Sequence, residues 1–505
     1  MLFNSYVFVF LFFPICLLGY YGLIHLQKNV AAKVFLIAMS LWFYGYFNLS
    51  YLLIMMCSIG ANYLFHRALS RRRDKAVMIL AAAVNLGVLF YFKYFDFFLA
   101  TVNEVFNSSV ALRGILLPLG ISFFTFQQIS FIADTYRGEV RDCSPIDYAL
   151  FVSFFPQLIA GPIVNHSEML PQFGQIGKKP VMWERISEGL GLFILGLAKK
   201  VLIADTFGAG VDYGYANLML LGRMDAIIVI VSYSLQLYFD FSGYCDMARG
   251  IGKMLGIEIP VNFNSPYKAS NIVDFWKRWH MTLNRFFAKY VYIPLGGSRV
   301  GAARMYLNLM IVFLLSGLWH GAGWNYLVWG AMHGVLYVLT RLWQRSLNSH
   351  FMGEKKKAAL SEDDFPVRMR RIIMTCVSHV FLFAYVTVAW VYFRAADIAQ
   401  ANRMIYTAVK GPAQKISADL AACFQMDEFW YVIKVLRLDN MAYSRYVLLW
   451  AMLAAGIYLS MVGRNAAERM ERIKYSMGSA AALAVLTLWC VLTFSKVSTF
   501  LYFNF

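Results

Sequence analysis

The sequence predicts an all-α polytopic membrane protein, and two observations carry this prediction. Of its 505 residues, 60% are hydrophobic and only 15% are charged, whereas a soluble protein usually carries about 25% charged residues. Residues 34–65 contain no charged side chain, and a membrane-spanning helix needs about 20 predominantly apolar residues. A chain of this composition cannot cover the surface of a soluble protein with polar groups.

Hydropathy predicts about a dozen spanning helices. The stretch 34–65 is too long for one span and short for two, so we expect two helices joined tightly around Tyr46–Ser50. The N-terminal segment lacks the basic stretch of a secretory signal and is kept as part of the first span. The expected spans are residues 5–25, 34–48, 50–66, 76–95, 115–135, 146–163, 187–205, 225–245, 303–320, 323–343, 372–394, 443–463 and 475–495.

Positive charge is concentrated in three loops, residues 67–75, 345–371 and 464–474, which we therefore expect on the cytoplasmic side. Segment 397–442 instead balances five basic with five acidic residues, and alternation of the spans places it outside, together with both termini. The same bias accounts for the formal net charge of +18. The charge therefore does not call for a nucleic-acid partner.

We expect a single membrane domain over residues 1–505, because no internal repeat is visible. Its central part differs from the rest: residues 239–298 alternate short apolar runs with Gly, Pro and charged residues. Such a segment is expected to be interfacial or re-entrant, lining a cavity or packed within protein. The expected subdivisions are N-terminal spans in 1–235, a catalytic core in 236–343, a cytoplasmic loop in 344–371 and C-terminal spans in 372–505, with 397–442 outside.

His320 is the strongest candidate for chemistry. It ends an uncharged run in the motif LSGLWHGAGWNYLVWG, and an ionisable side chain at membrane depth is costly and commonly functional. Histidine is also the usual general base near neutral pH, and the flanking glycines allow close approach of backbone or ligand. From these residues alone, catalysis and a buried histidine bonded to a carbonyl are equally good interpretations.

His333 lies thirteen residues beyond His320, which is about 220° around a helix. The two imidazoles would not share a face of one helix, so we expect a packing or hydrogen-bonding role for His333. No HExxH spacing occurs and the seven cysteines never form CxxC. The sequence therefore predicts neither a metal site nor a disulfide framework.

The segment Asp274–His280 alternates aromatic and basic side chains. Trp276 and Trp279 are three residues apart and share a helical face, which is typical of an interfacial helix with its indoles at headgroup level. Alternatively, Lys277 and Arg278 form a basic mouth that receives a phosphate-bearing acyl donor. These residues favour neither interpretation over the other.

Asp240 and Asp246 flank a Ser-Gly-Tyr sequence after an apolar helix. Buried carboxylates need partners, and Arg249 or Lys253 lie within the following helical turns. A structural network is favoured here over catalysis.

Several motifs together resemble the membrane-bound O-acyltransferase family, and in particular its bacterial branch that acetylates polysaccharides. The likeness extends from the first residues to Phe505. The motifs are LLPLGISFFTFQQISFIADTYRG (116–138), FFPQLIAGPI (154–163), LQLYFDFSGYCDMARGIGKMLG (235–256), FWKRWHMTLNRFFAKYVYIPLGGSR (275–299), LLSGLWHGAGWNYLVWGAMHG (314–334) and FLYFNF (500–505).

The resemblance implies a ring of about 11–13 helices with re-entrant or interfacial helices and a central tunnel. It places His320 at the family's catalytic histidine and His280 at its second polar position. Trp276 and Trp279 join Lys277 and Arg278 as donor-binding candidates. Supporting residues are expected at His333, Asp240, Asp246, Trp319 and Trp324. One departure is that the family's WLRDY before YIPLGG is replaced by FFAKY at 286–290, so no Arg–Asp pair carries over.

The resemblance also implies a function. An acetyl group would pass from a cytoplasmic thioester, acetyl-CoA, across the bacterial inner membrane to a cell-envelope polysaccharide or an exopolysaccharide such as alginate. His320 would be the general base, no cofactor would be bound, and an extracytoplasmic acetyltransferase would complete delivery, with 397–442 as a candidate docking surface. Alternatives are D-alanyl transfer from an acylated carrier protein to teichoic acid, a transporter of an acylated carrier, and a non-catalytic scaffold.

Tyr502 lies in the terminal aromatic motif FLYFNF. Related envelope-acylating systems have a similar terminal motif with a tyrosine, which implies that its hydroxyl carries the acyl group, with His320 as the activating base. The alternative is an aromatic residue at the membrane interface, in contact with lipid.

Overall fold

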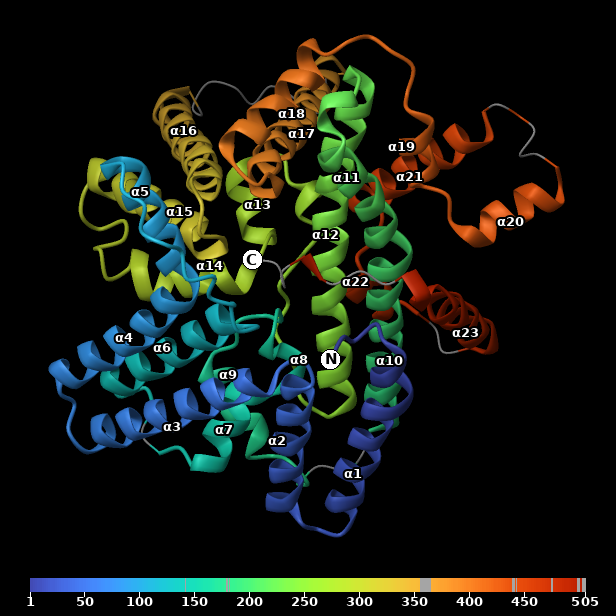
Figure 1. Ribbon diagram of the computed structural model, residues 1–505. Helices are drawn as coiled ribbons and strands as arrows, with labels where there is room; N and C mark the ends of the chain where they lie inside the picture. Colours follow the sequence, from blue (N-terminus) through green and yellow to red (C-terminus); the bar gives the residue numbers. More distant parts are fainter. Residues whose placement is uncertain are drawn as a thin grey trace. The chain divides into compact units, whose positions relative to one another are not determined.

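The computed structural model describes residues 1–140, 142–178, 180, 182–354, 365–437, 441, 443–473, 476–496 and 500–501, and within them it contains helices and no β-strand (Figure 1). Seven of the described helices are long and apolar enough to cross a membrane, and two shorter apolar helices accompany them. The prediction of an all-α polytopic membrane protein is therefore confirmed. The ring of helices and the central tunnel stay predictions.

The chain forms two compact units, each assembled from separate stretches. The first unit contains Met1–Leu202, Asp240–Val261 and Ala466–Phe505. The second contains Ile203–Phe239 and Asn262–Asn465. Both candidate histidines, His280 and His320, belong to the second unit.

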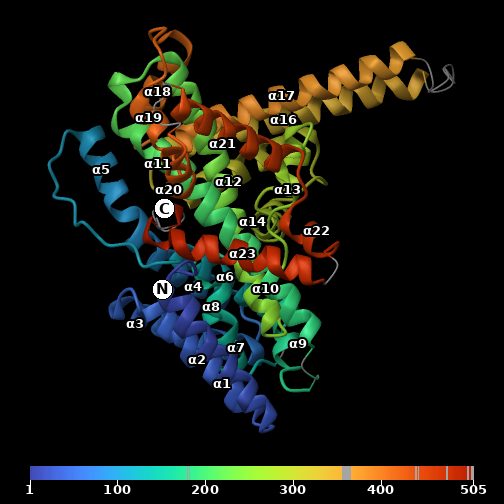
Figure 2. The ribbon, with the colours of Figure 1, turned by 90° about the vertical axis from the view of Figure 1, so that its right-hand side faces the viewer.

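The first unit opens with a helical hairpin followed by a long third helix. Helix η1 (Phe8–Phe12) continues into α1 (Phe13–His25), which packs beside α2 (Asn29–Gly45) (Figure 2). Helix α3 (Leu49–Arg71) follows after three residues, and the Asn48 side chain caps it by accepting from the Ser50 N–H. The expected tight joint around Tyr46–Ser50 is confirmed.

The next helices of the first unit include one that is mostly buried, α6 (Ile121–Arg137). Helices α4 (Lys75–Leu89), η2 (Phe90–Tyr94) and α5 (Phe95–Phe106) form one continuous run. Helix α6 follows, with almost every residue of its first half buried. Gly120 and Gly138 bound α6 in left-handed conformations, with φ of +71° and +79°, which glycine adopts at little steric cost.

The expected single span over 146–163 is wrong, because the chain breaks inside it. Helix α7 (Pro145–Ser153) ends at Phe154, and a short α8 (Phe155–Leu158) follows. Pro156 has no N–H to donate to the preceding turn, so a helix cannot run through it unbroken. The break is buried within protein, as non-helical backbone at membrane depth must be. Helix α9 (His166–Phe173) comes next and begins with a capping box of Asn165 and Glu168.

Helix α12 (Arg223–Met254) runs further than the sequence predicts, since we expected regular helix to end near residue 245. It follows a nearly continuous run of α10 (Trp183–Ala198), η3 (Lys199–Ala204) and α11 (Asp205–Ala216), and then η4 (Leu218–Leu220). The glycines that suggested a break instead allow close helix packing: a Cβ on Gly243 would lie 2.8 Å from the Gly196 carbonyl oxygen, and one on Gly250 would lie 2.5 Å from that of Gly189. Figure 1 shows α10 beside α12.

The segment after α12 contains no spanning helix, which agrees with the expected irregular centre. It includes η5 (Pro266–Lys268), α13 (Ile272–Arg278), α14 (Met281–Phe287) and η6 (Ala288–Tyr292). None of these helices is long enough to cross a membrane. They lie in the second unit with the helix that carries His320.

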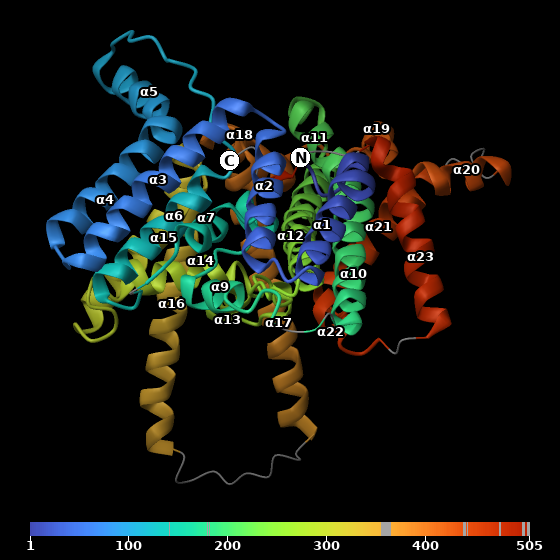
Figure 3. The ribbon, with the colours of Figure 1, turned by 90° about the horizontal axis from the view of Figure 1, so that it is seen from below.

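Helices α15 (Ala302–His320), α16 (Trp324–Glu354) and α17 (Phe365–Arg394) form the core of the second unit. The last two are longer than predicted: they extend into the expected loop 344–371, of which residues 355–364 lie outside the described chain. Figure 3 shows both helices running away from the short helices α13 and α14.

The expected outside segment 397–442 contains three short helices of the second unit, α18 (Ile398–Lys410), α19 (Ala418–Ala422) and α20 (Asp427–Val435). Helix α21 (Ser444–Met461) follows them and closes this unit. The first unit then resumes with α22 (Ala466–Met470), α23 (Met477–Leu492) and η8 (Thr493–Lys496).

Candidate functional site

His320 is the last residue of α15 and is only 3% exposed. Its Nδ1 lies 2.6 Å from the carbonyl oxygen of Ser316, one helical turn earlier. A carbonyl oxygen can only accept, so Nδ1 carries the hydrogen. In the neutral ring the lone pair is then on Nε2, and this is the tautomer that a general base acting through Nε2 requires.

Glycines shape the turn between α15 and α16. A Cβ on Gly317 would collide with the carbonyl oxygen of Tyr326, and one on Gly321 would collide with the Tyr326 ring. The two helices therefore approach closely only because these positions lack side chains. The close approach brings Trp329 of α16 against His320, with ring centroids 5.0 Å apart.

Aromatic rings surround the His320 imidazole. Trp319 lies 4.9 Å away, and Phe393 of α17 lies 5.2 Å away, both edge-on by centroid distance and angle. These ring contacts, together with the hydrogen bond to Ser316, hold the imidazole in one orientation.

His280 sits between α13 and α14 in a left-handed conformation, with φ of +46° and no exposed surface. Its Nδ1 lies 3.2 Å from Asn262 Oδ1, which also accepts from the backbone N–H (3.2 Å) and the hydroxyl (2.8 Å) of Thr282. A backbone N–H must donate, so the shared Asn262 atom is the oxygen and His280 Nδ1 carries a hydrogen. Burial, and then the nearby His320, hold the pKa of His280 well below its usual value.

The structure brings His280 and His320 together. Their ring centroids lie 6.2 Å apart and their planes are inclined by 75°. The indole of Trp319 contacts both, at 6.0 Å from His280 and 4.9 Å from His320. Two imidazoles and an indole therefore lie together in the second unit, and the catalytic roles predicted for the histidines remain predictions.

His333 belongs to the same aromatic cluster but does not contact His320 directly. Trp329 lies between them, 5.0 Å from each ring. His333 is fully buried against Trp276, and among the described residues its ring nitrogens have no hydrogen-bond partner. Packing is thus the role that the structure shows for His333.

Trp276 and Trp279 are 5% and 1% exposed, so the expectation of indoles at headgroup level is wrong. They pack inward because α13 lies against α16 and α17: Trp276 contacts Trp329 at 5.9 Å, and Trp279 contacts Trp390 at 4.9 Å. Helix α13 ends at Arg278 and Trp279 follows it in an extended conformation, so the two indoles do not share a helical face, and both meet protein rather than lipid.

The two basic residues of α13 differ from each other. Arg278 Nε lies 3.0 Å from both carboxylate oxygens of Asp274, one turn earlier on the same helix. Lys277 is exposed, and no ion pair with it is seen among the described residues. Donor binding by this segment stays a prediction, and Lys277 is the residue of α13 whose charge would be available for it.

Asp240 and Asp246 belong to the first unit and form ion pairs. Asp240 pairs with Lys200, and Asp246 pairs with Lys199, each at 2.6 Å. Arg249 approaches Asp246 at 3.9 Å, as the sequence suggested. The proposed partner Lys253 instead pairs with Glu188, so that expectation was wrong. The sequence signal that was missed is the adjacent pair Lys199 and Lys200 within the expected span 187–205.

The remaining predicted site residues are Trp319, Trp324 and Tyr502. Trp319 is buried, whereas Trp324 is 50% exposed, and Tyr502 lies outside the described residues. The sequence reasoning missed Asn262, Trp329, Trp390 and Phe393, because their importance arises from contacts with segments far along the chain. The described residues contain no cluster of three or more His, Cys, Asp or Glu side chains that can hold a metal ion.

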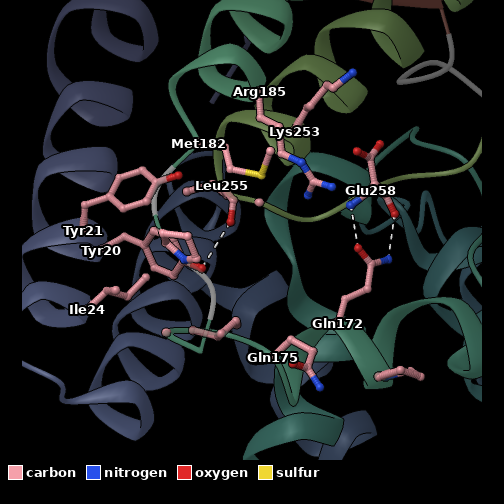
Figure 4. A pocket seen from close by; sticks show the side chains of 15 residues that line it. Tyr20, Tyr21, Ile24, Gln172, Gln175, Met182, Arg185, Lys253, Leu255 and Glu258 are labelled. Carbon is pink, nitrogen blue, oxygen red and sulfur yellow. Dashed lines mark hydrogen bonds between the residues drawn. The ribbon is translucent and has the colours of Figure 1, made fainter.

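The first unit contains a cavity of about 650 Å³ at the ends of α1 and α12 (Figure 4). Its walls are built rigidly: Tyr20 and Tyr21 donate to the carbonyls of Leu255 and Met254, and the Gln172 side chain exchanges two hydrogen bonds with the Glu258 backbone. Among the residues that the structure describes, none of the candidates for catalysis or donor binding lines this cavity.

Comparison with known proteins agrees with the resemblance. The sequence model of MBOAT, the membrane-bound O-acyltransferase family, matches residues 133–387. A peptidoglycan O-acetyltransferase of Helicobacter pylori is 41% identical over 80% of this chain and 79% of its own. A probable alginate O-acetylase AlgI of Pseudomonas aeruginosa is 37% identical over 80% and 74%, and a teichoic acid D-alanyltransferase of Lacticaseibacillus rhamnosus is 25% identical over 65% and 82%.

Long apolar helices and a buried histidine orientated by a hydrogen bond, together with these relatives, define a multi-pass membrane acyltransferase. The chain belongs to the membrane-bound O-acyltransferase family.

Proposed function

We propose that this protein transfers an acetyl group from acetyl-CoA to an acceptor hydroxyl, with His320 as the general base. The acetyl group is destined for a cell-envelope polysaccharide. The observation that carries the proposal is the hydrogen bond from His320 Nδ1 to the Ser316 carbonyl, because it leaves the lone pair on Nε2. His320 Nε2 takes the hydroxyl proton as the oxygen attacks the thioester carbonyl carbon. The carbon–sulfur bond then breaks, and the departing thiolate takes the proton from the imidazolium.

His280 takes a different part in this proposal. With its Nδ1 donating to Asn262, His280 Nε2 accepts, so it orients the attacking hydroxyl rather than stabilising the oxyanion. The rings around both histidines limit water, which would otherwise hydrolyse the thioester.

The first acceptor in this proposal is the phenol of Tyr502. Its attack on the thioester gives a tyrosyl acetate and the free thiol. A phenyl ester is activated, so its acetyl group passes on to a sugar hydroxyl and the phenol is regenerated. Support comes from the terminal aromatic motif and from Phe500, which is 1% exposed in the first unit.

Acetyl transfer to a polysaccharide is favoured over D-alanyl transfer by the degree of similarity. The peptidoglycan and alginate enzymes are 41% and 37% identical to this chain, whereas the D-alanyltransferase is 25% identical. We infer a location in the bacterial inner membrane, with both termini outside and the donor entering from the cytoplasm past Lys277.

An extracytoplasmic acetyltransferase that docks on segment 397–442 would complete delivery. Helix α20 of this segment exposes Tyr431, Val432 and Val435, which are 69%, 52% and 63% exposed. Apolar side chains on a segment expected outside the membrane suit a protein partner.

The experiment compares His320→Ala with His379→Ala in cells that lack the native gene. His379 makes the same type of bond, from Nδ1 to the Thr375 carbonyl one turn earlier at 2.7 Å, but it is only half-buried and lies on α17. The His320 variant should lower base-labile acetate on the purified envelope polymers by a factor of about 10²–10⁴, and the His379 variant should not. Normal acetate with a correctly inserted His320→Ala protein would refute the proposal. If the parent protein adds D-alanyl ester rather than acetate to the polymers, the choice of donor is refuted.

A further inference from the structure

Lys200 and Asp240 form an ion pair inside the first unit, between η3 and α12. The ammonium and the carboxylate lie 2.6 Å apart, and their side chains are 1% and 2% exposed. Asp240 lies within a helix long enough to span the membrane. Charges at such a depth are costly to bury and usually serve a function.

Residues 500 and 501, here called the C-terminal segment, contact both members of this pair. The Leu501 N–H donates to Asp240 Oδ2 at 3.0 Å, while Oδ1 of the same carboxylate contacts Lys200. The Lys200 ammonium lies 4.7 Å from the centroid of the Phe500 ring, a distance at which a cation is attracted to the ring face. The pair is therefore shared between two helices and the C-terminal segment.

The Phe500 ring is held from a further side. It meets the Tyr244 ring edge-on at 4.7 Å, and Tyr244 stacks on Phe3 at 4.9 Å. Its contact with Lys200 is polar in origin, and its contact with Tyr244 is apolar. Together with the Leu501 hydrogen bond, these contacts hold residues 500 and 501 in place.

We propose that the Lys200–Asp240 pair is a positioning clamp that holds residues 500 and 501, the first two residues of the terminal motif that carries the proposed acyl relay. The proposal rests on the relay proposed above and adds the residues that position it. An aromatic peptide at a membrane interface has no preferred register, whereas bonds to a buried carboxylate and ammonium are directional. Lys200 and Asp240 are positioning residues and need not touch the acyl group.

A charge exchange separates this role from simple helix joining. In the double variant Lys200→Asp with Asp240→Lys an ion pair still links the two helices, but residue 240 no longer offers an oxygen to the Leu501 N–H and residue 200 no longer offers a cation to Phe500. The matched control is Lys199→Asp with Asp246→Lys, which exchanges the neighbouring pair of the same length, 2.6 Å. Phe500→Leu is a milder second variant that leaves the ion pair intact.

The readout is chemical labelling of residue 501. Leu501→Cys is introduced into a background in which the exposed or half-buried cysteines are replaced by serine; these are Cys57, Cys143, Cys376 and Cys423. The rate of reaction with a membrane-impermeant maleimide is measured in membranes, alongside thermal unfolding and envelope acetate. Losing a charge-assisted bond should raise the labelling rate by about 10-fold to 100-fold in the 200/240 exchange. Phe500→Leu should raise it several-fold, and the 199/246 exchange should leave it unchanged.

Each outcome decides the proposal. The clamp is overturned if the folded 200/240 exchange is labelled at the parent rate. If the 200/240 exchange does not fold, labelling of Phe500→Leu at the parent rate overturns the clamp instead. An equal increase in the 199/246 exchange also overturns it, because the pair would then act only by joining helices. Faster labelling confined to the clamp variants supports it, and if envelope acetate then stays at the parent level the clamp stands while the Tyr502 relay fails.

Discussion

His280 and His320 lie with their imidazole centroids 6.2 Å apart, although forty residues separate them in the sequence. Each ring has its Nδ1 committed to a protein oxygen, that of Asn262 or of Ser316. Both rings are therefore orientated by a hydrogen bond at Nδ1, and in the neutral form the lone pair of each ring is on Nε2.

Asn262→Ala should loosen the turn that carries His280. Asn262 Oδ1 accepts from Thr282 and His280, and these bonds hold residue 280 in a left-handed conformation that costs about 1 kcal/mol or more. We expect a loss of about 1–3 kcal/mol in the free energy of unfolding together with weaker acylation. Asn217→Ala is the control, because among the described residues the Asn217 side chain donates only to the Tyr213 carbonyl of the adjoining helix α11. Equal effects of the two variants on acylation would contradict the assignment.

Gly317→Ala should displace α16 from α15, because the added methyl would collide with the Tyr326 carbonyl. Overpacking of this kind costs about 1–3 kcal/mol, and the shift of Trp329 should disturb His320 and lower the acylation rate. Gly60→Ala in α3 is the matched control, since nothing lies within 4 Å of a Cβ there. It should be neutral, or stabilise by up to about 1 kcal/mol. Thermal unfolding and envelope acetate are the measurements, and a neutral Gly317→Ala would argue against tight α15–α16 packing.

Stability should fall in acid partly because of His280. Burial and the nearby His320 hold its pKa well below the usual value, so the folded-state pKa is below the unfolded one of about 6.5. The contribution of His280 is then fully present above about pH 6.5 and is lost as the pH falls, by at most about 1.4 kcal/mol per pH unit. Thermal unfolding at about pH 8 and about pH 5.5 should show a smaller decrease for His280→Asn than for the parent protein. An equal decrease would mean that another group is responsible.

Lys277→Gln should weaken binding of the acyl donor without affecting folding, because Lys277 is exposed whereas Arg278 is engaged by Asp274. A surface contact with phosphate worth about 0.5–1 kcal/mol corresponds to a 2-fold to 5-fold rise in the KM for acetyl-CoA. Lys410→Gln on α18, in the segment expected outside, should leave the KM unchanged. If both variants behave like the parent, Lys277 has no part in donor binding.

Tyr502→Phe keeps the aromatic ring and removes only the hydroxyl. A residue that merely anchors the chain at the interface tolerates this change, whereas a relay loses its nucleophile. We expect acetate on the envelope polymer to fall to the background level while acetyl-CoA binding persists. Acylation at the parent rate would show that Tyr502 carries no acyl group.

Much of the fold followed from local sequence patterns. The long apolar stretches predicted the membrane helices, and the joint between α2 and α3 was expected where it occurs. The break at Phe154 was missed, although Pro156 was a visible signal, because hydropathy alone does not register the missing N–H of a proline. The continuation of α12 was missed for the opposite reason: Gly243 and Gly250 read as helix breakers, but they are contact points with α10.

The sequence by itself determined that this is a membrane protein and that His320 stands out, since both conclusions depend on the polarity of residues and their near neighbours. The tertiary structure decided which groups meet. It turned Trp276 and Trp279 inward rather than toward lipid, and it brought Asn262 to His280. It also paired Asp240 with Lys200 rather than with Arg249 or Lys253. Such pairings depend on which helices pack within a few ångströms of one another, and no local pattern of hydropathy or charge encodes that choice.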